Sequence, residues 1–168
     1  KGAPRAAAQA GSRSFTTRWL YRVTIYLQLM SQLLRDSEYR ALADFRFQLR
    51  RFLAFSEEKA RGVSLEPRHH QLLLAVRGLP PGTPPTVSAV AERLLLRHHT
   101  VVGLVDRLQQ RGLIRRDRAA EDRRQVRLTI TPRGEDLLHG LSIAHRDELA
   151  SLGPALVTAL RRVLRRRA

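Results

Sequence analysis

Four consecutive polar side chains form the clearest candidate for chemistry in this chain: Arg97, His98, His99 and Thr100. They open a segment, residues 97–108, in which apolar side chains recur at three- and four-residue steps, as on one face of a helix. Arginine can bind guanine through two hydrogen bonds, threonine can contact thymine, and histidine can bind phosphate or base. The cluster predicts a surface suited to nucleic acid. The competing interpretation is that one of the two adjacent histidines faces the core.

A second basic cluster lies further along the chain, where Arg118, Arg123 and Arg124 stand with Asp122 beside two of them. Short strand patterns precede and follow it, so the cluster is expected at the tip of a hairpin. A narrow minor groove concentrates negative potential and attracts inserted arginine. The alternative is a solvated hairpin tip with an exposed ion pair.

The elements that must hold these two clusters lie between residues 86 and 134. Residues 87–94 form a first amphipathic helical repeat, and Gly112 is expected to end the second helix, because glycine tolerates a positive φ. Residues 113–115 and 125–131 read as strands, the latter with strict alternation of apolar and polar side chains. Helix, turn, helix and hairpin is the order of a winged helix-turn-helix. We therefore expect a mainly α (α+β) fold.

Two hydroxyl side chains, Thr86 and Ser88, stand at the start of the first of these helices. Hydroxyls and free backbone N–H groups at a helix N-terminus suit a phosphate. Simple helix capping explains the same residues equally well. Both interpretations stay open from the sequence.

Helical patterns flank this head, and we expect residues 36–62 and 135–167 to form dimerisation arms around a DNA-binding domain over residues 66–134. In the first arm Ser37 is the expected N-cap, and in the second Gly153-Pro154 is expected to break the helix. One apolar seam on the first arm, at three- and four-residue steps, consists of Leu42, Phe45, Leu49 and Phe52. Arms with apolar seams and no third layer to cover them imply a dimer.

The composition limits the class of partner. The formal charge of +16 over 168 residues favours a polyanionic partner, although the near-absence of lysine has a simple explanation in a GC-rich genome. There is no cysteine, which excludes a disulfide framework, a thiolate metal site and a cysteine redox switch. No apolar run reaches the roughly 18 residues of a membrane span. We expect a cytoplasmic, nucleoid-associated protein without membrane contact.

Residues 1–29 differ from the rest: their first part is small, basic and free of acidic residues, without helical or strand periodicity. Met30 is the only methionine and stands ahead of a well-patterned helix. We expect residues 1–29 to be a disordered or non-native extension. The alternative is a true extension that packs on a partner subunit.

The segments VAERLLLRHHTVVGLVDRLQQRGLIRR (90–116) and DRRQVRLTITPRG (122–134) carry a resemblance to the MarR family of winged-helix transcription regulators. It covers roughly four fifths of the chain. The resemblance implies a homodimer held by the terminal helices, a pseudo-palindromic DNA operator, and a small-molecule pocket where arms meet heads. It also implies that Arg124 enters the minor groove, that Asp122 orients it, and that Arg123 binds phosphate.

The chain departs from the family pattern at three positions. Leu95 and Arg97 stand where relatives often carry glycine in the turn and serine at the helix N-cap. Gly103 stands where many relatives carry a long polar or basic side chain. Base reading is therefore expected to shift toward the first turn of the second helix.

Phe45, Phe52, His69 and His70 are the candidates for lining the small-molecule pocket, although the two histidines are equally suited to the core. The chain carries no glycine-rich phosphate loop and no motif of a nucleophilic or acid–base catalyst, so no enzymatic activity and no cofactor are expected. The histidines lack ligand spacing on one helix face, so no metal is expected either.

The sequence therefore predicts a dimeric, sequence-specific regulator of transcription, acting as a repressor whose DNA affinity a small aromatic or anionic effector lowers. The alternative is an architectural or nonspecific nucleic-acid-binding winged-helix dimer. A regulator prefers its operator by roughly a thousandfold or more over random DNA, which an architectural protein does not.

Overall fold

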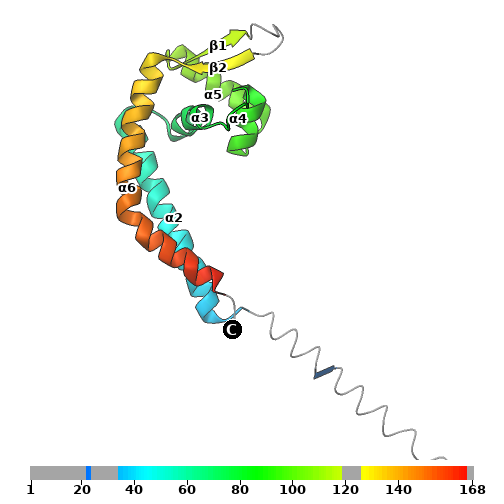
Figure 1. The fold of residues 1–168 in the computed structure, drawn as a ribbon, viewed down its shortest axis with the longest axis vertical. Helices are drawn as coiled ribbons and strands as arrows, with labels where there is room; N and C mark the ends of the chain where they lie inside the picture. Colours follow the sequence, from blue (N-terminus) through cyan, green and yellow to red (C-terminus); the bar gives the residue numbers. More distant parts are fainter. Residues whose placement is uncertain (1–21, 24–33, 119–125, 166–168) are drawn as a thin grey trace, which may run out of the picture.

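A computed structural model describes residues 22–23, 34–118 and 126–165. Its elements are α2 (Asp36–Gly62), α3 (Pro67–Arg77), α4 (Val87–Leu94), α5 (His98–Gln110), β1 (Ile114–Arg118), β2 (Val126–Ile130) and α6 (Pro132–Leu164). Figure 1 shows α2 and α6 side by side as a long arm, with the other elements gathered into a head toward one end of it. Within the described ranges, no helix is apolar over a length that would cross a membrane. The expectation for residues 1–29 lies outside the described residues, apart from 22 and 23.

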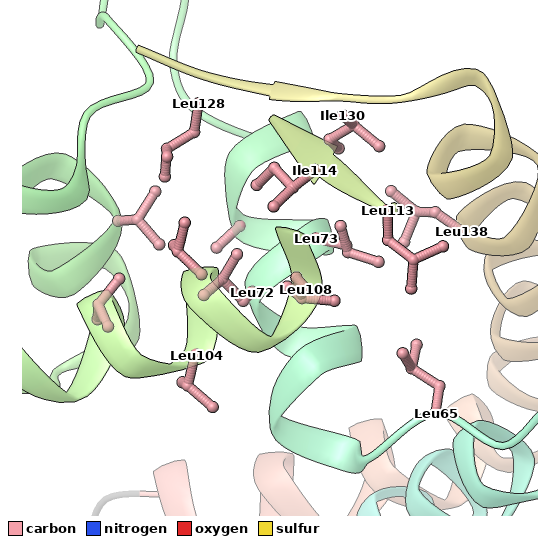
Figure 2. Packing of buried hydrophobic residues seen from close by; sticks show 14 of the residues in the cluster. Leu65, Leu72, Leu73, Leu104, Leu108, Leu113, Ile114, Leu128, Ile130 and Leu138 are labelled. Atoms are coloured by element: carbon pink, nitrogen blue, oxygen red, sulfur yellow. The ribbon is translucent and has the colours of Figure 1, made fainter. Parts of the chain in front are cut away.

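One apolar core joins α3, α4, α5, the sheet and the start of α6, as Figure 2 shows. The largest fully buried side chains are Leu65, Leu72, Leu73, Leu108, Leu113, Ile114, Leu128, Val90, Val101 and Val105. Burying one leucine or isoleucine stabilises a fold by about 1.5–3 kcal/mol. The head therefore has a core of its own, and its rigidity fixes where its surface side chains stand.

The boundaries of α4 and α5 follow the sequence signals at two of their four ends. Thr86 caps α4, its Oγ1 accepting a hydrogen bond from the N–H of Ala89 at 3.2 Å. Gly112 follows α5 with a φ of +66°, as expected for a glycine that ends a helix. Leu95 ends α4 at a φ of +55° and is 93% exposed. Arg97 is the N-cap of α5 without a capping hydrogen bond from its side chain.

The two strands form an antiparallel hairpin whose register runs from Ile114 opposite Ile130 to Arg118 opposite Val126. The expected alternation holds on the inner face at Leu128, which is fully buried, and at Ile130, whereas Val126 at the outer end is 39% exposed. The N–H of Leu128 donates to the carbonyl of Pro85 at 2.7 Å. This bond fastens the hairpin to the loop that precedes α4.

The connection between head and arm is short and tight. Only Thr131 separates β2 from α6, and its hydroxyl donates to the carbonyl of Gly112 at 2.7 Å while accepting the N–H of Gly134 at 3.1 Å. Gly134 packs so closely that a Cβ there would overlap the carbonyl oxygen of Leu113 and the side chain of Ile130. The start of α6 is thus fixed to the sheet.

The expected break at Gly153-Pro154 is wrong, because α6 continues through both residues to Leu164. Proline removes one backbone donor and strains the preceding turn, but packing can hold such a helix together. Beyond Pro154 the helix still packs on α2, where Ala159 is buried and Arg162 pairs with Asp44 at 3.4 Å. Figure 1 shows α6 curving as it follows α2.

The start of α2 also differs from the expectation, since Ser37 lies inside the helix and Arg35 is the N-cap. The carboxylate of Glu38 accepts the backbone N–H of Arg35 at 2.7 Å, so an acidic side chain within the first turn satisfies the free donor. Along the seam Phe45 and Phe52 are half-buried, whereas Leu42 and Leu49 are each 39% exposed. The second helix of the arm therefore covers only part of the seam.

Candidate nucleic-acid interface

The first turn of α5 presents its polar side chains outward. Arg97, His98 and His99 are exposed and Thr100 is half-buried, while Val101 behind them is fully buried. The interpretation that one histidine faces the core is therefore wrong, because the apolar stripe of α5 starts only at Val101. Three adjacent donor side chains stand at the positively polarised end of a helix.

The start of α4 lies beside the start of α5. The hydroxyl of Ser88, which is exposed, lies 3.4 Å from Nδ1 of His98. Thr86 is half-buried and uses its hydroxyl to cap α4, so for Thr86 the capping interpretation is confirmed. The two N-termini together offer the hydroxyl of Ser88, two imidazoles and a guanidinium within one surface.

The hairpin carries an exposed arginine at its described end, on β1. Arg118 is exposed and closes the register opposite Val126, and Asp122, Arg123 and Arg124 lie outside the described residues. On the hairpin itself, hydrogen bonds from the hydroxyl of Thr129 and from Arg115 hold the pKa of the Asp117 carboxyl below its usual range. That carboxylate therefore remains charged, and its Oδ2 forms an ion pair with Nε of Arg115 at 2.9 Å.

A side-chain cluster that sequence reasoning missed ties the hairpin to α5. The guanidinium of Arg116 on β1 lies 2.6 Å from Oδ1 of Asp106 and donates to Oε1 of Gln109 at 2.7 Å. Asp106 and Gln109 are three residues apart on α5, which puts both on the face beside the strand. The three-residue spacing of Asp106 and Gln109 was the only sign of this cluster in the sequence. It does not identify Arg116 as the strand residue that completes the cluster.

Gly103 leaves room on the surface of α5. A Cβ added there would meet nothing within 4 Å. The position can thus hold a longer side chain, as the resemblance implies for relatives, and in this chain it presents only backbone.

The four residues expected to line a small-molecule pocket are not all brought together. Phe52 and His70 both lie against the ring of His145, with centroids 5.9 Å and 4.8 Å away. Phe45 lies two helical turns, about 10 Å, before Phe52 along α2. His69 and His70 are buried, and their assignment to a pocket or to the core stays open.

The two buried histidines stay neutral at ordinary pH. Burial, with a smaller contribution from the neighbouring His145, lowers the pKa of His70 to about 4. Burial also lowers the pKa of His69, an effect that Arg111 and Arg107 reinforce and Glu66 opposes. Within the described residues both ring nitrogens of His69 and Nε2 of His70 are buried without a hydrogen-bond partner. These nitrogens are the polar atoms available to a bound molecule at the junction of head and arm.

Comparison with known proteins agrees with this geometry. The MarR family model matches residues 63–125, which span α3, α4, α5 and β1. The comparison with curated protein sequences finds no match.

Solved structures share the fold at low identity. AbsC, a MarR family transcriptional regulator from Streptomyces coelicolor, superposes with a TM-score of 0.61 at 17% identity, covering 72% of this chain and 81% of that one. A MarR family protein from Bacillus stearothermophilus gives 0.60 at 19%, covering 71% and 82%. The F27L mutant of S. aureus MepR, bound to an oligodeoxyribonucleotide, gives 0.54 at 20%, covering 66% and 79%.

These findings confirm the resemblance to the MarR family and the winged-helix fold that it implied. They support the assignment of a DNA-binding transcription regulator. The residues of this chain that contact DNA stay a prediction.

Proposed function

We propose that the protein is a homodimeric, sequence-specific regulator that binds a pseudo-palindromic operator and represses transcription until a small effector releases it. The observation that carries the proposal is the first turn of α5, where Arg97, His98 and His99 are all exposed beside Ser88. A recognition helix enters the major groove with these N-terminal residues nearest the base edges. Such a protein acts on the nucleoid.

The position of the hairpin supports the same assignment. Because Arg116 fastens β1 to Asp106 and Gln109 of α5, the hairpin has a fixed position relative to the helix. A wing held beside a recognition helix can reach the neighbouring minor groove with its tip arginines. We assign that contact to Arg124, oriented by Asp122, with Arg118 and Arg123 on phosphate. The MepR mutant of similar fold, solved with an oligodeoxyribonucleotide, gives independent support.

The arm supports the dimer. Apolar side chains remain exposed along the flanks of both arm helices: Leu42, Leu49 and Leu53 on α2, and Leu149, Val157, Leu160 and Leu164 on α6, each with 39% or more of its surface accessible. Two helices cannot cover these flanks by themselves, and a patch of this kind on a monomer marks an interaction site. A second copy of the same arm offers a matching surface, which suits the symmetry of a palindromic operator.

The effector site is proposed at the junction of head and arm, around Phe52, His69 and His70. The unpartnered ring nitrogens of the two histidines can donate to or accept from a polar group, and Phe52 can pack on an aromatic ring. A small aromatic or anionic molecule fits that chemistry. Since the chain has no cysteine, effector binding rather than thiol oxidation is the proposed trigger.

The test is quantitative binding of the full chain to the intergenic DNA upstream of its own gene and to a scrambled duplex, at physiological salt. We expect nanomolar binding to the first and a preference of roughly a thousandfold over the second. Equal, weak and salt-sensitive binding to both duplexes would overturn the proposal in favour of an architectural protein.

Two variants separate base reading from general attraction. Arg97→Ala should weaken operator binding by about tenfold or more, the cost of one lost guanine contact. Arg165→Ala, which removes an exposed arginine at the far end of the arm, is the matched control and should leave the affinity within about twofold. Equal losses of operator affinity in the two variants would mean that Arg97 contributes only its charge to DNA binding.

A further inference from the structure

The side chain of His145 on α6 joins both arm helices to the head. Its Nε2 lies 2.6 Å from the hydroxyl of Ser56 on α2, and its ring stacks on His70 of α3 with centroids 4.8 Å apart and planes inclined by 19°. Phe52 and Phe55 of α2 approach the same ring edge-on, each at 5.9 Å. Three helices therefore meet at one imidazole.

Hydrogen bonds fix the orientation of this ring. Nδ1 of His145 lies against the carbonyl oxygen of Leu141, which can only accept, so Nδ1 carries the proton. In the neutral ring Nε2 is then unprotonated and accepts the hydroxyl proton of Ser56. Rotating the ring would break both bonds and the stack on His70 together. The bond to Ser56 and the stack on His70 connect α6 to α2 and α3 at this point with a defined geometry.

This joint is one of several attachments between the head and the arm, and of those on α6 named here it lies furthest along the helix. The others on α6 are Leu138 and Leu141 in the head core, the ion pair of Glu135 with Arg77, and Gly134, packed against Leu113 and Ile130 at the start of the helix. His145 follows about 16 Å further along the helix, at 1.5 Å per residue. Because the attachments are spread over that length of the helix, they fix the angle between the head and the arm, and His145 holds the end away from the hairpin.

We propose that His145 is a positioning residue for DNA recognition, holding the head at the angle to the arm that sets which half-site spacing the dimer accepts. The inference rests on the proposed function, because the angle matters only if two heads bind one operator. Each added base pair moves a half-site by about 3.4 Å and turns it by about 35° around the DNA axis. Two heads held at a fixed angle can therefore contact both half-sites at one half-site spacing only.

The first experiment tests the joint without DNA. Because the chain has no cysteine, spin labels attach only at introduced thiols, here Arg93→Cys on α4 and Glu58→Cys on α2, both exposed positions. The doubly labelled full chain is diluted with unlabelled chain so that the distances measured lie within one subunit. In His145→Phe, which keeps a ring for stacking but loses both hydrogen bonds, we expect the distance distribution to broaden roughly twofold.

His139→Phe is the matched control, since His139 is an exposed histidine on the same helix and should leave the distribution unchanged. Ser56→Ala removes the partner of Nε2 alone and should broaden the distribution by a smaller amount than His145→Phe. An unchanged width in His145→Phe would overturn the proposal. Circular dichroism of each variant shows that the helices are intact.

The second experiment tests the consequence for recognition. The wild-type chain selects its site from a random duplex pool, and binding is then measured on duplexes with half-sites one and two base pairs closer or further apart. We expect wild-type affinity to fall by about tenfold per base pair and that of His145→Phe by less than about threefold, with unchanged binding to a single half-site.

The outcomes separate the two proposals. An identical spacing profile in both proteins, or an equal loss for His145→Phe at every spacing, would overturn the positioning role. Failure of the wild-type chain to select any sequence would overturn the proposed function instead, and the spin-label distances would still report whether His145 fixes the head.

Discussion

Arg116 of β1 and Asp106 of α5 form an ion pair with a nitrogen–oxygen distance of 2.6 Å, and this pair connects the wing to the helix that carries the exposed histidines. The side chains are 28% and 49% exposed, so solvent screens their attraction. The pair therefore fixes the position of the hairpin beside α5 more than it stabilises the fold.

The first prediction concerns this pair. Asp106→Ala should lower the free energy of unfolding by less than about 1 kcal/mol, as is typical of partly exposed ion pairs. Operator affinity should fall severalfold because the wing is no longer held beside α5. Urea denaturation and DNA titration on the same samples separate the two effects. Asp147→Ala, which removes an exposed partner of Arg146 on α6, should change neither quantity.

The second prediction concerns pH. The pKa of His70 is about 4 in the folded protein and near 6.5 when unfolded, so the unfolded chain binds more protons between these values. The contribution of neutral His70 to the free energy of unfolding should be fully present above pH 6.5. It should be lost as the pH drops toward 4, by on the order of 3 kcal/mol for this group. His69 should act in the same direction.

Urea unfolding measured from pH 4.5 to 7.5 checks this expectation. His70→Phe should flatten the profile, since the titrating group is gone while a ring remains to stack on His145. His139→Gln, at an exposed position on α6, should keep the wild-type slope. A His70→Phe profile as steep as that of the wild type would show that other groups cause the pH dependence.

The third prediction concerns backbone strain at Leu95, which has a φ of +55° and a side chain 93% exposed. The left-handed region costs a residue with a Cβ about 1–2 kcal/mol, and an exposed side chain recovers little of it. Leu95→Gly should therefore stabilise the protein by about 1 kcal/mol in thermal unfolding. Ser64, at a φ of 54°, offers the same test outside the helix-turn-helix, and a loss of stability in both glycine variants would contradict the argument.

The fourth prediction sets two glycines against each other. At Gly103 a Cβ meets nothing within 4 Å, so Gly103→Ala should stabilise α5 by about 1 kcal/mol through helix propensity alone. At Gly134 the added methyl would overlap the carbonyl of Leu113, so Gly134→Ala should destabilise the protein by about 3 kcal/mol. Thermal unfolding of the two variants should shift in opposite directions.

Local signals were sufficient for much of the fold. Thr86, Gly112 and Thr131 stand where a cap or a left-handed turn is needed, and each takes the expected role. The exposure of His98 and His99 was left open by the sequence, because spacing alone does not fix where the apolar stripe of a helix begins. Here it begins at Val101, which is fully buried.

Long-range contacts were beyond the sequence. Pro154 predicts a break locally, and only packing of the following turns on α2 keeps α6 continuous. His145 meets Ser56 from a position 89 residues away along the chain, and periodicity contains no information about such a pair. The same holds for Arg116, whose partners on α5 become visible only when the strand is placed.

The single residue between β2 and α6 has a practical consequence. Thr131 is hydrogen-bonded on both sides, so the strand and the helix are joined without slack. Inserting one residue here would rotate everything after it by about 100° around the helix axis. Chimeras that exchange heads between related proteins should therefore be joined within the arm helices, with this junction transplanted whole.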